Sequence, residues 1–133
     1  MATPPSPMTL HLRYRIWIAE MNSDIDLLRI YNDYLQELKA LHNTLKLKKE
    51  IERFETAFSS LRNEIDTLRN EMHLLKMKLA TFIREKKQLA YSEYKTDNHK
   101  LLKKKYVSLS KKFGSIKADL KELVKKAARS KEA

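Results

Sequence analysis

Apolar side chains recur at alternating steps of four and three residues through the middle of the chain, and this repeat constrains the fold more than any other feature. Its members are Leu47, Ile51, Phe54, Phe58, Leu61, Ile65, Leu68, Met72, Leu75, Leu79 and Phe82. Such spacing places one apolar stripe along an α-helix and is typical of helices that coil around a partner helix. We therefore expect a long helix over residues 44–90, with Thr44 as its N-cap.

Two further segments carry stripes of the same kind. The segment expected to be helical over residues 10–42, behind an N-cap at Thr9, carries Tyr14, Trp17, Met21, Leu28, Tyr31, Leu35 and Leu38. The segment expected over residues 97–128 carries Leu102, Tyr106, Leu109, Phe113, Ile116, Leu120, Leu123 and Ala127. Asn22, Ser23 and Asp24 form a capping sequence, so the first helix is either continuous or divided there.

Proline, the residue that breaks a helix most strongly, is confined to one end of the chain. All three prolines lie within the first seven residues, and the only glycine, Gly114, lies beside the third stripe, compatible with a close approach or a bend. Because proline cannot donate a backbone hydrogen bond, we expect residues 1–8 to form a disordered leader. Residues 9–130 should then form a single helical-bundle domain.

Short connections between long helices favour antiparallel neighbours. The expected fold class is therefore all-α, an elongated up-down-up bundle of three antiparallel helices with coiled-coil-like packing. Dimerisation would complete this bundle if one of its helices kept an apolar face in solvent.

A resemblance to known sequences is carried by three parts of the chain. They are the run Ile51-Glu52-Arg53-Phe54 with Phe58, the run Arg62-Asn63-Glu64-Ile65-Asp66-Thr67-Leu68 with Glu71, and the shorter Trp17-Ile18 and Asp97-Asn98-His99. Together they resemble small, uncharacterised helical proteins of Bacteroidetes, over nearly the whole chain after the leader. Residues 90–95 depart from that pattern. The resemblance implies a helical fold and implies no function.

The first helix carries more apolar residues than one stripe requires. A second stripe, turned about 130° around the helix, consists of Leu12, Ile16, Leu27, Ile30, Tyr34 and Leu41, and Leu74 and Met77 lie off the stripe of the second helix. Either the first helix is the most buried member of a monomer, or these residues contact a partner. Twofold dimers are the commonest oligomers. We therefore expect a non-enzymatic interaction module that forms a homodimer or binds another helical protein.

The formal net charge of +11 is concentrated in the second half of the chain. The candidate anion-binding residues are Lys103, Lys104, Lys105, Lys111, Lys112, Lys117, Lys121, Lys125 and Lys126. Runs of charge more often form a solvated face, and the aromatic residues Tyr106 and Phe113 belong to the core stripe rather than to a base-stacking surface. The alternative function is thus a basic scaffold that binds nucleic acid or an anionic membrane weakly, non-specifically and in a salt-dependent manner.

The charged flanks of the second helix predict how it pairs with the third. Flanking positions of the same type meet in an antiparallel pair. We therefore expect an acidic row to face a basic row, the first being Glu64, Glu71 and Glu85 and the second Lys105, Lys112 and Lys126.

Catalytic, cofactor and metal sites are not expected. The four histidines are scattered singly, with His42 and His99 assigned to helix ends, and the chain has no cysteine. Neither a phosphate-binding loop nor a nucleophile elbow is present in the sequence. No signal sequence and no run of about eighteen apolar residues occurs, so we expect no membrane span and take the cytoplasm as the default location.

Overall fold

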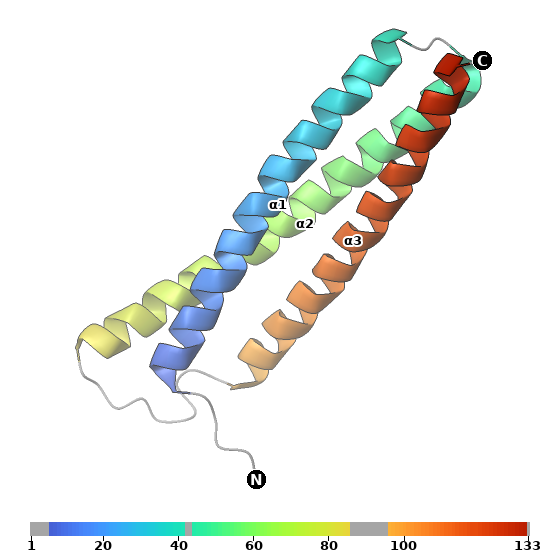
Figure 1. Cartoon of the computed structure of the whole chain (residues 1–133). Coiled ribbons are helices and arrows are strands. Elements are labelled where there is room, and N and C mark those ends of the chain that lie inside the picture. The colour runs from blue at the N-terminus through green and yellow to red at the C-terminus, as the bar shows by residue number, and fades with distance from the viewer. Residues whose placement is uncertain (1–5, 42–43, 86–95, 133) are drawn as a thin grey trace.

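The computed structural model describes residues 6–41, 44–85 and 96–132, and within them it contains three α-helices. They are α1 (Pro7–Leu41), α2 (Leu45–Arg84) and α3 (Thr96–Glu132). α1 and α3 run in the same direction and α2 runs in the opposite one (Figure 1). The expected all-α, up-down-up bundle is confirmed.

α1 begins earlier than the sequence predicted, inside the segment expected to be disordered. Ser6 caps it in place of Thr9, because the Thr9 backbone N–H donates to Ser6 Oγ (3.2 Å) and the Leu10 N–H donates to the Ser6 carbonyl (3.0 Å). Pro7 then occupies the first helical position, where a missing N–H breaks no hydrogen bond of the helix. Residues 1–5 of the expected leader lie outside the described residues.

The other helix boundaries follow the predictions in part. α1 is continuous through Asn22, Ser23 and Asp24, so the divided alternative is wrong. α2 begins behind Thr44, whose Oγ1 accepts a hydrogen bond from the Leu47 N–H (3.4 Å), as predicted. α2 ends at Arg84. Glu85, which was also predicted to be helical, caps this end of α2, and residues 86–90 lie outside the described residues.

The three predicted stripes form one hydrophobic core. The largest fully buried side chains are Tyr14, Met21, Leu35, Ile51, Ile65, Met72 and Leu79. α3 contributes the buried Leu102, Leu109, Phe113, Leu120, Leu123 and Ala127. Half-buried members of the stripes, among them Trp17, Tyr31, Tyr106 and Ile116, pack against this cluster. Helical periodicity therefore identified the buried side of all three helices.

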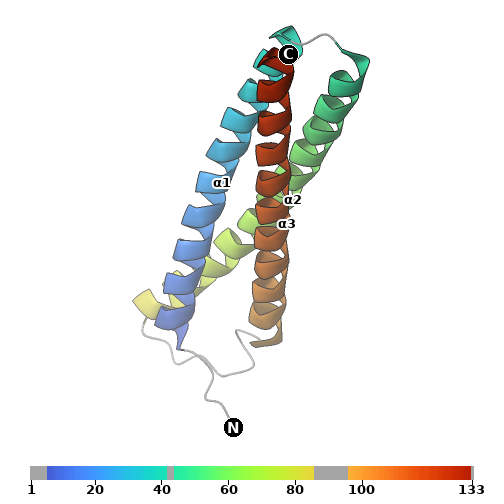
Figure 2. The same cartoon turned by 45° about the vertical axis from the view of Figure 1, so that its right-hand side comes forward.

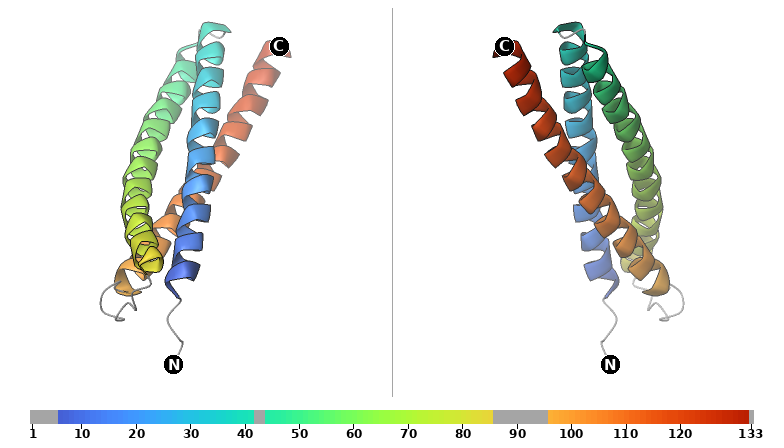
Figure 3. Two further views of the ribbon diagram at one scale, coloured as in Figure 1. Left: turned by 90° about the vertical axis from the view of Figure 1, so that its left-hand side faces the viewer. Right: turned by 90° about the vertical axis from the view of Figure 1, so that its right-hand side faces the viewer.

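Aromatic rings fill the space between α1 and α3. The ring centroids of Trp17 and Tyr106 are 5.3 Å apart and those of Tyr31 and Phe113 are 6.4 Å apart, and both pairs are stacked. Large side chains at a contact increase the distance between helix axes, and the backbones of α1 and α3 accordingly approach each other less than those of α1 and α2. α3 lies obliquely across the α1–α2 pair (Figures 2 and 3).

Gly114 does not mark a close approach of helices. A Cβ atom built on it would meet nothing within 4 Å, and α3 continues through this position. The predicted packing role of the glycine is therefore wrong.

The molecule is elongated. The 40 residues of α2 correspond to a length of about 60 Å at the usual rise of an α-helix. Within the described residues, no helix combines the length and the apolar character needed to cross a bilayer.

Candidate interaction surfaces

The second apolar stripe of α1 points away from the core. Its largely exposed members are Leu12 (53% exposed), Ile16 (48%), Ile30 (57%) and Leu41 (70%). Leu27 and Tyr34 are half-buried and pack against the core cluster. We call these six residues the outer face of α1, with Leu27 and Tyr34 at its edge. In the single chain, α1 therefore presents an apolar face to solvent.

The two apolar residues of α2 that were expected to join this face lie elsewhere. Leu74 and Met77 are exposed. They lie on the side of α2 that faces away from its buried stripe. Arg69 Nη1 donates a hydrogen bond to Asn22 Oδ1 (2.8 Å), which fixes how the two antiparallel helices are aligned. Leu74 and Met77 are thus level with the first turns of α1 but point outward from a different helix.

Ion pairs connect α2 to α3 at heptad intervals. They join Lys112 Nζ to Glu64 Oε1 (2.9 Å), Lys105 Nζ to Glu71 Oε2 (3.5 Å) and Lys126 Nζ to Glu50 Oε1 (3.8 Å). The first two pairs confirm the predicted meeting of the acidic and basic rows. Lys126 lies two heptads after Lys112 in α3. Because α2 runs in the opposite direction, the partner of Lys126 lies two heptads before Glu64, at Glu50. Glu85, the third predicted member of the acidic row, lies at the opposite end of α2.

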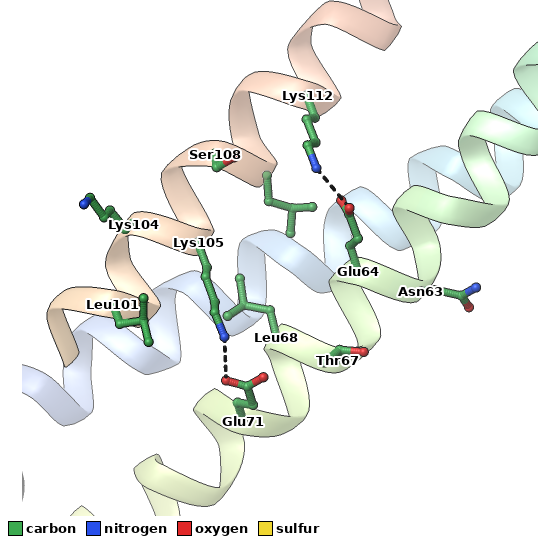
Figure 4. A pocket seen from close by; sticks show the side chains of 11 residues that line it. Asn63, Glu64, Thr67, Leu68, Glu71, Leu101, Lys104, Lys105, Ser108 and Lys112 are labelled. Carbon is green, nitrogen blue, oxygen red and sulfur yellow. Dashed lines mark hydrogen bonds and ion pairs between the residues drawn. The ribbon is translucent and has the colours of Figure 1, made fainter. Parts of the chain in front are cut away.

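A groove of about 660 Å³ lies between α2 and α3 beneath two of these pairs. Leu68, Leu101 and Leu109 line its apolar part, and the pairs formed by Lys105 and Lys112 cross it (Figure 4). Glutamates already bind these two lysines, whereas Lys104, which also lines the groove, forms no ion pair in the described part of the chain. The groove is mainly an apolar depression.

The structure separates the predicted anion-binding lysines into those that form contacts and those that are free to bind an anion. Lys105, Lys112, Lys125 and Lys126 form ion pairs with glutamates, and Lys117 Nζ lies 5.3 Å from the centroid of the Phe113 ring. The others, Lys103, Lys104, Lys111 and Lys121, are exposed and form no ion pair within the described part of the chain. Lys100, Lys103, Lys104 and Lys111 lie with the exposed Leu101 and Val107 on one side of α3.

A buried polar contact that the sequence did not predict joins the first turns of α1 and α3. The hydroxyl of Tyr14 forms a hydrogen bond with Nδ1 of His99, and both side chains are buried. Burial raises the pKa of the Tyr14 hydroxyl well above its ordinary range. His99 lies three residues before Leu102, so its spacing to the third stripe indicates a buried position as well as the predicted place at a helix end.

Asp24 lies at the edge of the core stripe of α1, next to the buried Ile25. Met21 and Leu28 are seven residues apart in that stripe, and Asp24 lies half-buried between them. Burial raises the pKa of its carboxyl group, the Lys117 ammonium acts in the opposite direction, and the Glu20 carboxylate adds to the increase. An acidic group thus occupies a position where the heptad pattern calls for an apolar one.

Neither a metal centre nor a relative directs the assignment of function. In the part of the chain that the structure describes, no three potential ligands among His, Asp and Glu lie close enough together to hold a metal ion. No family model, curated protein or solved structure matches the chain. The resemblance to helical proteins of Bacteroidetes stays a prediction, and function has to be argued from the surfaces.

Proposed function

We propose that this protein is a helical interaction module that self-associates through the outer face of α1. The observation that carries the proposal is the exposure of Leu12, Ile16, Ile30 and Leu41 along one helix. An apolar face of this kind, continuous with the core at the half-buried Leu27 and Tyr34, is typical of a protein interaction site. A second helix placed on it would remove these side chains from water.

The size of the face predicts a weak affinity. About half of each exposed side chain is still to be buried, which corresponds to roughly 1 kcal/mol per residue and roughly 8 kcal/mol for two copies. Association costs at least about 4 kcal/mol of lost freedom. The net gain of about 4 kcal/mol corresponds to a dissociation constant of about 1 mM.

Size-exclusion chromatography with light scattering tests the proposal. The wild-type mass should rise above the 15.8 kDa of one chain as the concentration increases from about 10 µM to about 1 mM. Ile30→Lys should remain monomeric, because it would bury a charge in the contact. The matched control is Val107→Lys, which places the same charge at an exposed apolar position of α3 and should behave as the wild type. A wild type that stays monomeric throughout would rule the proposal out.

A second candidate function is favoured by the exposed lysines beside Leu101 and Val107 on α3. In this alternative the protein is a basic scaffold, and Lys104 and Lys111 contribute to weak, non-specific binding of an anionic polymer.

Titration with duplex DNA and with anionic vesicles at low and high salt measures such binding. Replacing Lys104 and Lys111 together by Glu should weaken it strongly, since the change reverses charge at the proposed site. Replacing Lys46 and Lys49 of α2 by Glu changes the net charge equally and serves as control. No binding of wild type at low salt would eliminate this candidate.

A further inference from the structure

The outer face of α1, extended by Ala19 and Ser23, carries apolar residues at equal distances on both sides of Ser23. Counted outward from Ser23, the matched positions are Ala19 and Leu27, Ile16 and Ile30, and Leu12 and Tyr34. At about 100° per residue, all six lie within about 40° of the direction of Ser23. A helix that carries such a sequence can meet a reversed copy of itself with apolar residues opposite apolar residues at every step.

We propose that two copies of this chain pair in antiparallel orientation through the outer face of α1, around a twofold axis at Ser23. The proposal rests on the proposed self-association and specifies its geometry. A twofold contact is self-complementary, because the same patch of both subunits forms it. Ile16 of one copy then meets Ile30 of the other, and Ser23 meets its own counterpart.

Charge at the edge of the face favours the antiparallel orientation. A twofold axis of this kind brings each flank of α1 against the same flank of the second copy. Arg15 and Asp33 lie on one flank, both about 80° from the direction of Ser23 and on opposite sides of it along the helix. Both are exposed, and neither forms an ion pair in the described part of the chain. In the antiparallel pair, Arg15 of one copy and Asp33 of the other lie on the same flank. Their positions along the helix axis differ by only about 3 Å.

Parallel pairing would have the opposite electrostatic result. Each flank of α1 would then meet the opposite flank of the second copy, so Arg15 would lie within about 3 Å, along the helix axis, of the level of Arg13. Like charges in contact disfavour association. Of the charges nearest the axis, Glu20 and Asp26 lie on opposite flanks, and each would be about 9 Å along the helix axis from its own counterpart in the second copy. Asp26 is already paired with Arg29 in its own chain. The small side chains of Ala19 and Ser23, both exposed, allow the helices to approach at the centre.

A charge exchange tests the orientation. Arg15→Asp alone and Asp33→Arg alone should each weaken self-association about tenfold, because attraction becomes repulsion at two places in the dimer. An equimolar mixture of the two variants should form heterodimers at least as readily as the wild type dimerises. The chain that carries both substitutions should also dimerise again. A mixture that associates no better than either single variant would overturn the antiparallel arrangement.

Cysteine cross-linking provides a second readout, since the chain contains no cysteine of its own. Under mild oxidation, Ser23→Cys should form a covalent dimer, because its two copies meet on the axis within disulfide reach. Ile30→Cys should not cross-link to itself but should cross-link to Ile16→Cys in a mixture.

The outcomes separate this inference from the proposed function. A wild type that dimerises while Ile30→Cys cross-links readily to itself refutes only the antiparallel geometry. A wild type that is monomeric at every concentration refutes both the geometry and the self-association.

Discussion

Replacing Asp24 by leucine should stabilise the bundle, although the substitution removes a charged group that lies near a lysine. Asp24 lies at the edge of the core stripe of α1 between the buried Met21 and Leu28, and burial raises the pKa of its carboxyl group. A leucine there would extend the apolar stripe without interruption. The neighbouring Lys117 is exposed and would be solvated by water after the change.

The magnitude follows from the partial burial of the site. Full burial of a leucine side chain is worth about 1.5–3 kcal/mol, so a half-buried position should yield about 1 kcal/mol. The loss of the electrostatic attraction to Lys117 subtracts at most a fraction of that amount, because exposed charge pairs contribute about 0–1 kcal/mol. We therefore expect Asp24→Leu to increase the free energy of unfolding at neutral pH.

The pH dependence distinguishes charge from packing. Since the pKa of Asp24 is raised above its ordinary value of 3.8, the folded chain holds this proton more tightly than the unfolded chain. Below that value the carboxyl is protonated in both states and ionisation has no effect. As the pH rises through the raised pKa, the folded state must accommodate a carboxylate and loses stability. The advantage of Asp24→Asn over wild type should therefore grow from about pH 4 and become constant above the raised pKa.

Urea denaturation followed by circular dichroism measures these differences, with all proteins at one concentration because association also affects stability. Asp24→Leu should unfold at higher urea than the wild type at pH 7. An Asp24→Leu variant that is equally or less stable than the wild type at pH 7 would refute the reasoning. A constant difference between Asp24→Asn and wild type from pH 4 to 7 would refute the electrostatic part.

Three further substitutions test the packing. Ile65→Ala should lower the free energy of unfolding by about 3 kcal/mol, because it leaves a cavity at a fully buried site; a thermal melt showing under about 1 kcal/mol would contradict this burial. Gly114→Ala should raise the free energy of unfolding by about 1 kcal/mol, since alanine favours the helix and the added Cβ meets open space. A lower melting temperature than that of the wild type would contradict this prediction. Tyr14→Phe should cost about 1–3 kcal/mol through loss of the buried hydrogen bond; unchanged urea unfolding would contradict that bond.

The core was predictable because burial in a helical bundle follows a short-range period. Leu47 to Phe82 alternate without interruption, and the buried side of α2 follows from that spacing alone. The pairing of Lys112 with Glu64 was also predictable, because equal heptad steps in opposite directions bring the charged rows together.

Other features depend on distances that no local pattern encodes. The Tyr14 hydroxyl meets a histidine 85 residues away in the sequence, and this contact depends on the level at which α3 begins. Ser6 and Thr9 are both good N-cap residues, so the sequence could not decide which of them starts α1. The division of the outer face of α1 into exposed residues and a half-buried edge depends on where the neighbouring helices lie.

Hydroxyl-radical footprinting over a concentration series tests most directly whether the outer face of α1 is the contact between copies. The side chains of Leu12, Ile16 and Ile30 are exposed in one chain, so each should be oxidised in dilute solution. From about 10 µM to about 1 mM their oxidation should fall, while that of the exposed Val107 on α3 stays constant. Equal oxidation of the face at every concentration would contradict the account.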